Sequence, residues 1–175
     1  MKLLITLFVL LLLQSCTTQD SRQQLVIKPG NIPTVWQAKG RLGVVHDNKM
    51  QNLGFVANFK DQNFNLTLTS ALGMGEVNIV SSIQGLQING NTLKLNLHQW
   101  MKRTLGWHFP LDKLPAIVFK HQLDVGSDWQ IEITKLKSFK EMSVAKIIKL
   151  NHKSKPIRIK FLLQEITATQ VKLAS

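Results

Sequence analysis

The chain has 175 residues, a length that suits one domain with a sizeable hydrophobic core. Its only cysteine, Cys16, excludes an internal disulfide, so the fold must be stabilised by packing alone. A formal net charge of +12 indicates an anionic partner rather than a basic one.

The N-terminus carries a targeting signal. Lys2 precedes an apolar stretch, residues 3–13, which is too short for a bilayer core that needs about 20 residues. This layout predicts a signal peptide over residues 1–15. The run Leu13-Gln14-Ser15-Cys16 resembles the lipobox of bacterial lipoproteins, in which the signal is removed and the cysteine is acylated. The alternative is a secretory signal that happens to end near a cysteine.

Residues 16–31 are mostly polar and contain Pro29-Gly30, so we expect a lipidated N-terminus followed by a flexible tether. Residues 32–175 are then expected to form one domain. Alternation of apolar and polar residues predicts antiparallel strands. We place them at 36–44, 53–59, 64–69, 76–81, 86–89, 92–95, 129–136, 142–150 and 156–166.

Two segments between these strands have helical spacing. Apolar residues recur at intervals of three and four over 97–105, and a second helix is expected over 111–122, with Pro115 in its first turn. The order of strands, helical insert and strands predicts a mostly β fold, a curved antiparallel sheet or barrel with helices laid against one face.

The basic residues are unevenly distributed. Residues 135–172 hold ten Lys or Arg against only Glu141 and Glu165. A secreted, anchored chain meets little nucleic acid, so phosphate head groups or an acidic protein are better candidate partners. The alternative is a solvated lysine-rich face.

No pattern indicates catalysis, a metal or a cofactor. The five histidines lie at none of the zinc-binding spacings. Gly73-Met74-Gly75 lacks the strand-to-helix context of a phosphate loop, and Gly-x-Ser-x-Gly is absent. We therefore expect a protein that is not an enzyme.

Several segments resemble the LolB family of outer-membrane lipoproteins. Residues 36–44 are similar to its opening strand, and residues 64–70 followed by Ala71-Leu72-Gly73 to its third strand and the next loop. The stretch from Leu105-Gly106 through Pro110 to Leu114 is similar to its helical segment. With the lipobox, the resemblance covers residues 36–166.

This resemblance implies an incomplete antiparallel β-barrel with helices acting as a lid over an apolar cavity. It also implies a monomer that is lipid-anchored at the periplasmic face of the outer membrane. Such a protein receives acylated lipoproteins from a periplasmic carrier, LolA, holds their acyl chains, and inserts them into outer-membrane lipid. No cofactor, metal or nucleic acid is implied.

The cavity needs apolar walls, and the candidates on the strands are Trp36, Leu42, Phe55, Phe59, Phe64, Leu66 and Leu68. On the lid they are Trp100, Met101, Leu105, Trp107 and Phe109. The alternative for each of them is ordinary core.

The loop after the third strand places Leu72 and Met74 among glycines, where exposed apolar side chains indicate contact with lipid or a partner. In the family the matching leucine helps to insert cargo into the membrane. The alternative is a buried hairpin tip.

The rival function is a structural or scaffold lipoprotein that binds an envelope protein or polysaccharide and carries no acyl cargo. A closed, well-filled core would favour this rival, whereas an open cavity under the helices would favour the acceptor.

Overall fold

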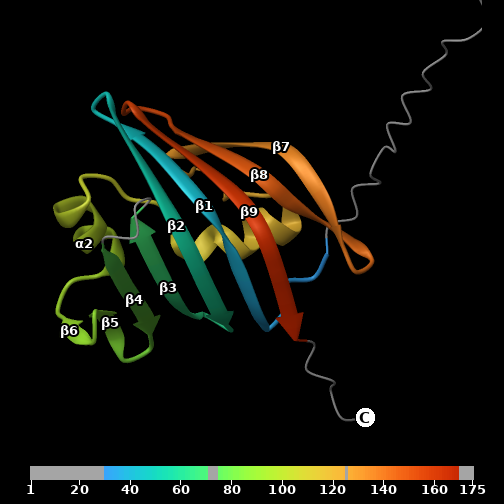
Figure 1. Ribbon diagram of the computed structural model, residues 1–175, viewed down its shortest axis with the longest axis horizontal. Coiled ribbons are helices and arrows are strands. Elements are labelled where there is room, and N and C mark those ends of the chain that lie inside the picture. The colour runs from blue at the N-terminus through green and yellow to red at the C-terminus, as the bar shows by residue number, and fades with distance from the viewer. Residues whose placement is uncertain (1–29, 71–74, 125, 170–175) are drawn as a thin grey trace, which may run out of the picture.

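The computed structural model describes residues 30–70, 75–124 and 126–169. In this part of the chain, nine strands form one antiparallel sheet in the order β6-β5-β4-β3-β2-β1-β9-β8-β7 (Figure 1). The strands are Val35–His46 (β1), Lys49–Lys60 (β2), Asn63–Ser70 (β3), Glu76–Ser82 (β4), Gly85–Ile88 (β5), Asn91–Leu93 (β6), Trp129–Phe139 (β7), Met142–His152 (β8) and Ile157–Thr169 (β9). All nine expected strands are confirmed, with shifted ends.

Tight turns explain why neighbours in sequence pair in the sheet. Asp47 and Asn48 join β1 to β2 with φ values of 49° and 58°, and Asn89 and Gly90 join β5 to β6 with 50° and 80°. Two successive residues at positive φ match the twist of a two-residue hairpin, and Asn, Asp and Gly tolerate that conformation. The turn fixes the β1–β2 register, which runs from Val35 opposite Lys60 to His46 opposite Lys49.

The helical insert begins with α2, Leu97–Thr104. Asn96 caps it, because its side chain accepts a hydrogen bond from the Gln99 N–H and the Gln99 side chain accepts one from the Asn96 N–H. Lys102 and Arg103 in the last turn face the negative end of the helix dipole.

The second expected helix, 111–122, is wrong in detail. The structure has a 3-10 turn, Leu111–Lys113 (η2), and a π-helical turn, Ala116–Lys120 (η3), in its place. Pro115 lies between them, and a proline has no N–H to donate inside a regular helix. His121 ends the segment at a positive φ of 58°.

The helical insert packs on one face of the sheet, and its yellow segment lies behind β1, β2 and β9 in the view of Figure 1. Among the described residues, no helix covers the other face. Apolar side chains from both layers form one core. The insert contributes Trp100, Met101, Trp107, Phe109, Leu111, Leu114, Ile117, Val118 and Phe119, all less than 10% exposed. None of the described helices is long and apolar enough to cross a bilayer.

The expected incomplete barrel is confirmed only as an open antiparallel sheet. The sheet is antiparallel and remains open, since its end strands β6 and β7 do not pair with each other among the described residues. The helices cover the sheet as expected, but a lid over an open apolar cavity is not confirmed. The physical reason is that side chains of the insert fill the space that the cavity would occupy.

A close approach of β1 to β9 depends on Gly40. The register shifts between Lys39 and Gly40, and a Cβ at Gly40 would collide with the Leu162 carbonyl. We expect Gly40→Ala to lower the free energy of unfolding by about 1–3 kcal/mol, because the strands must move apart. Gly43→Ala is the matched control, since its Cβ would meet only the Asn52 side chain, at 3.4 Å. Urea unfolding measures both, and equal midpoints would contradict the prediction.

Candidate acyl-chain site

The space between the sheet and the helical insert is nearly filled. A gap of ≈ 10 Å³ remains there, about the room of one water molecule. Its walls are entirely apolar side chains. They come from three separate parts of the chain, namely strands β1 to β3, the helical insert, and β9. They are Leu42, Phe55, Leu66, Leu68, Met101, Trp107, Phe109, Leu111 and Phe161.

Aromatic contacts run across this interface. Phe161 on β9 contacts Phe55 on β2 with ring centroids 5.7 Å apart, and Phe109 of the insert with centroids 4.9 Å apart. Further along the strands, Trp36 stacks on Phe59 at 4.4 Å and meets the edge of Phe119 from η3 at 4.9 Å. These contacts are apolar and only weakly directional, so other apolar groups of similar size can replace them.

The structure brings seven of the twelve predicted wall residues to the gap: Leu42, Phe55, Leu66, Leu68, Met101, Trp107 and Phe109. Trp36, Phe59 and Phe64 border a separate hollow of ≈ 440 Å³ at another place on the sheet. Trp100 is buried and Leu105 half-buried, and neither borders the gap.

Two residues that border the gap, Leu111 and Phe161, are not among the residues predicted from the sequence. Phe161 lies in a strand with clear alternation, but only the β1–β9 pairing brings it beside the gap.

The Trp107 indole is an unusual group for this setting. The side chain is 2% exposed, and its Nε1–H has no hydrogen-bond partner in the described structure. A buried donor without a partner costs about 1–3 kcal/mol. A ligand that brings a carbonyl oxygen into this apolar interface can relieve that cost.

Three histidines meet beside the insert. His98 from α2 stacks on His108 at 3.8 Å, and His108 lies 6.1 Å from His152 at the end of β8. Trp129 completes this histidine cluster, with its ring 5.0 Å from that of His152. No three His, Cys, Asp or Glu side chains lie where they could share a metal ion, within the residues that the structure describes.

The cluster disfavours a proton on His108. Burial, followed by the neighbouring His98, His152 and Lys155, lowers the pKa of His108 from 6.5 to about 4, while Asp128 acts in the opposite direction. The unfolded chain takes up this proton near pH 6.5, whereas the folded chain takes it up only near pH 4. The cluster therefore makes the fold less stable as the pH falls through this window.

We expect wild-type protein to lose about 1–2 kcal/mol of unfolding free energy between pH 6.5 and 4 through His108, after allowance for solvent screening. His108→Gln should remove that part of the pH dependence. Urea unfolding across this pH range measures it, with His46→Gln, outside the cluster, as the control. Parallel stability curves for wild type and His108→Gln would refute the assignment.

Burial also lowers the pKa of His121, and a backbone hydrogen bond with Ser143 partly opposes this shift. His121 directly follows η3. A neutral ring at this position suits the apolar surroundings of the insert.

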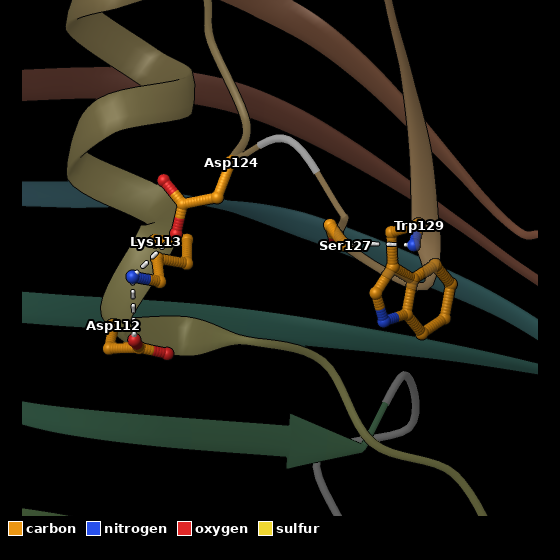
Figure 2. A network of polar contacts seen from close by, with 5 residues as sticks. All are labelled: Asp112, Lys113, Asp124, Ser127 and Trp129. Carbon is orange, nitrogen blue, oxygen red and sulfur yellow. Dashed lines mark hydrogen bonds and ion pairs between the residues drawn. The ribbon is translucent and has the colours of Figure 1, made fainter.

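An exposed ion pair joins η2 to the segment that precedes β7. Lys113 Nζ lies 2.7 Å from Asp124 Oδ2 and 3.7 Å from Asp112 Oδ2 (Figure 2). The hydrogen bond to Asp124 is the main reason that the pKa of Lys113 is raised. In the same view, the backbone N–H of Trp129 donates a hydrogen bond to Ser127 Oγ at 3.2 Å, where β7 begins.

The predicted lipidation site, Cys16, and the predicted insertion loop residues, Leu72 and Met74, lie outside the described residues. The basic C-terminal segment forms β7 to β9 for the most part. Burial, with Lys146 nearby, lowers the pKa of Lys137 on β7, although Glu165 partly compensates.

Comparison with known proteins identifies relatives. The family model of the outer membrane lipoprotein LolB matches residues 34–119. An outer-membrane lipoprotein LolB of Francisella tularensis subsp. novicida (strain U112) is 28% identical over 127 residues, an alignment that covers 64% of this chain and 60% of that protein. A second LolB, from Francisella tularensis subsp. tularensis (strain WY96-3418), is 28% identical over 83 residues, or 45% of this chain and 40% of that protein. The matches thus span less than two thirds of the relatives' own length.

Proposed function

We propose that this chain, which matches the LolB family model over residues 34–119 and is similar to outer-membrane lipoproteins of that name, receives acylated lipoproteins from a periplasmic carrier and inserts them into the outer membrane. The observation that supports this most is the apolar interface between the sheet and the insert. Nine side chains surround the gap there, and none of them carries a charge.

The gap of ≈ 10 Å³ is too small for an acyl chain, so cargo must displace side chains of the insert. Loss of their contacts is offset when acyl methylenes take their place, at about 0.8 kcal/mol for each buried methylene. The exchange replaces apolar contacts with apolar contacts. The insert is thus a plug that cargo displaces, rather than a lid above an empty cavity.

The Trp107 N–H adds a polar anchor to this proposal. Acyl chains of a lipoprotein are attached through ester or amide carbonyls, which accept hydrogen bonds. A carbonyl beside Trp107 would satisfy a donor that has no partner in the described structure. Cargo therefore gains one directional contact within an otherwise apolar site.

A photoreactive side chain at Met101 tests whether cargo enters this interface. Met101 is 1% exposed and borders the gap, whereas its neighbour Lys102 is exposed and points away from the core. With labelled lipoprotein supplied on the purified carrier, cross-linking should occur from position 101 and not from position 102. Equal cross-linking from both positions, or none from 101, would contradict the proposed site.

The nearly filled core also favours the second candidate, a structural or scaffold lipoprotein that binds an envelope protein or polysaccharide. A scaffold needs no internal space, and the described core leaves room for about one water molecule. The two candidates differ in the cross-linking experiment, because a scaffold would leave labelled cargo on the carrier.

Anchoring gives a separate prediction. Cys16→Ala should prevent acylation and, if the chain is not processed, leave the signal attached, so the protein should be lost from the outer membrane, because buried acyl methylenes supply the attachment there. Mass spectrometry of the mature N-terminus and membrane fractionation measure this. A wild-type protein that is soluble and unacylated would end the anchoring proposal.

A further inference from the structure

The sheet face opposite the insert carries a hollow of ≈ 810 Å³ that crosses β8, β9, β1 and β2 and reaches the end of β3. We propose that this hollow, named the basic groove, binds the phosphate head group of an anionic phospholipid. The inference rests on the proposed function, which places this protein beside the outer membrane.

Cations line the basic groove on three strands: Arg41 on β1, Lys149 on β8, and Arg158 and Lys160 on β9. No Asp or Glu is among its lining residues. Lys149 pairs with Glu132 at 3.1 Å, whereas no ion pair holds the other three among the residues that the structure describes. Arginine can bind a phosphate through two parallel hydrogen bonds.

The strand register brings like charges together. Lys149 lies directly opposite Lys160, and Arg158 lies two positions away on the same side of β9. Like charges at opposite positions of a sheet are destabilising. A bound phosphate would remove this repulsion, so the arrangement fits an anion better than it fits a free surface.

Two glycines leave the groove floor open. Gly43 and Gly54 lie on this face, and glycine weakens a strand. A Cβ would meet only a side-chain atom 3.4 Å away at Gly43, and atoms no closer than 3.9 Å at Gly54. A Cβ would therefore fit at both positions, so close packing does not require glycine there. A floor without side chains at these two positions instead leaves room for a head group beside the cations.

The position of the groove favours lipid over a protein partner. Its lining includes Thr69 and Ser70, which directly precede residues 71–74 in the chain. The proposed insertion residue, Leu72, belongs to that segment. If Leu72 enters the bilayer, the end of β3 lies at the level of the head groups, and the basic groove faces their phosphates.

Binding to vesicles tests the proposal, with a chain that lacks residues 1–16 and keeps every residue of the core. Vesicles of phosphatidylglycerol and phosphatidylcholine are compared with vesicles of phosphatidylcholine alone. The Arg158→Gln/Lys160→Gln variant should bind the anionic vesicles about 25-fold more weakly, or roughly fivefold for each cation.

The matched control is Lys102→Gln/Lys120→Gln, which changes the net charge equally but alters exposed residues of the insert. It should lose less than about threefold, because these cations lie outside the groove. Equal losses in both variants would mean that net charge alone attracts the protein to vesicles, and would overturn the proposal.

Two further readouts separate the possible outcomes. Thermal unfolding should show that Arg158→Gln/Lys160→Gln is at least as stable as wild type, since it removes a like-charge contact. Cross-linking of cargo at Met101 should be unchanged, so a failed groove and a failed acceptor function are distinguishable. If this variant binds vesicles normally and instead loses salt-sensitive association with the carrier, the groove is a protein-docking surface and the lipid proposal is wrong.

Discussion

Leu66→Glu is expected to unfold the domain or bring it close to unfolding. Leu66 is 4% exposed, lies between Ala57 and Ile79 on the neighbouring strands, and borders the gap. A carboxylate there must lose its water without gaining a partner or take up a proton, and either outcome costs several kcal/mol. The total stability of a domain is about 5–15 kcal/mol, so we expect a loss of about 4–5 kcal/mol.

Urea unfolding followed by far-UV circular dichroism measures this loss. Asn58→Glu is the control, because it adds the same charge on the exposed side of β2. Its unfolding midpoint should stay close to that of wild type. A fully stable Leu66→Glu protein would mean that this face of β3 reaches water, and the interface described above could not be the acyl-chain site.

Leu72→Glu is expected to separate receipt of cargo from its delivery. If Leu72 enters the bilayer, a carboxylate there opposes insertion by several kcal/mol unless it is neutralised. The apolar interface under the insert is unchanged. The variant should therefore fold, take lipoprotein from the carrier, and fail to place it in liposomes.

Ile83→Glu is a matched control for Leu72→Glu. Ile83 lies in the turn between β4 and β5 and is 95% exposed, so it is an apolar residue between two strands whose side chain lies outside the core. The Ile83→Glu variant should deliver cargo normally. If Leu72→Glu unfolds the domain, the loop belongs to the core; if it delivers cargo as well as Ile83→Glu does, the insertion role of Leu72 is refuted.

Much of the fold was predictable because local patterns and tertiary structure agree. Alternation of apolar and polar residues around Phe55 and around Ile159 predicts strands with one buried face, and the structure has such strands there. The pair Asn89-Gly90 predicts a hairpin turn, which the structure also has. The break at Pro115 was harder to predict, because a proline suits the first turn of a helix as well as the interruption seen here.

The state of the acyl-chain site could not be predicted from the sequence. An apolar side chain such as Trp107 or Phe109 gives the same periodicity whether it lines a cavity or fills one. Only the distance between the sheet and the insert decides this, and that distance depends on packing between residues far apart in the chain. The histidine cluster is similar, since His98, His108 and His152 share no sequence spacing and meet only through the fold.

The basic groove was predictable from the sequence only in part. Arg158 and Lys160 have the spacing of two that places side chains on one face of a strand. Their position opposite Lys149 and beside β1 depends on the strand order, in which β1 pairs with β9. The expectation of an anionic partner for the C-terminal segment stays a prediction, and the vesicle experiment now addresses it at named residues.

Transfer of cargo from the carrier tests the central claim most directly. A labelled lipoprotein is loaded on the purified carrier, this protein without residues 1–16 is added, and the two are separated before the label is counted. The account predicts that most of the label moves to this protein; label that stays on the carrier would contradict the account.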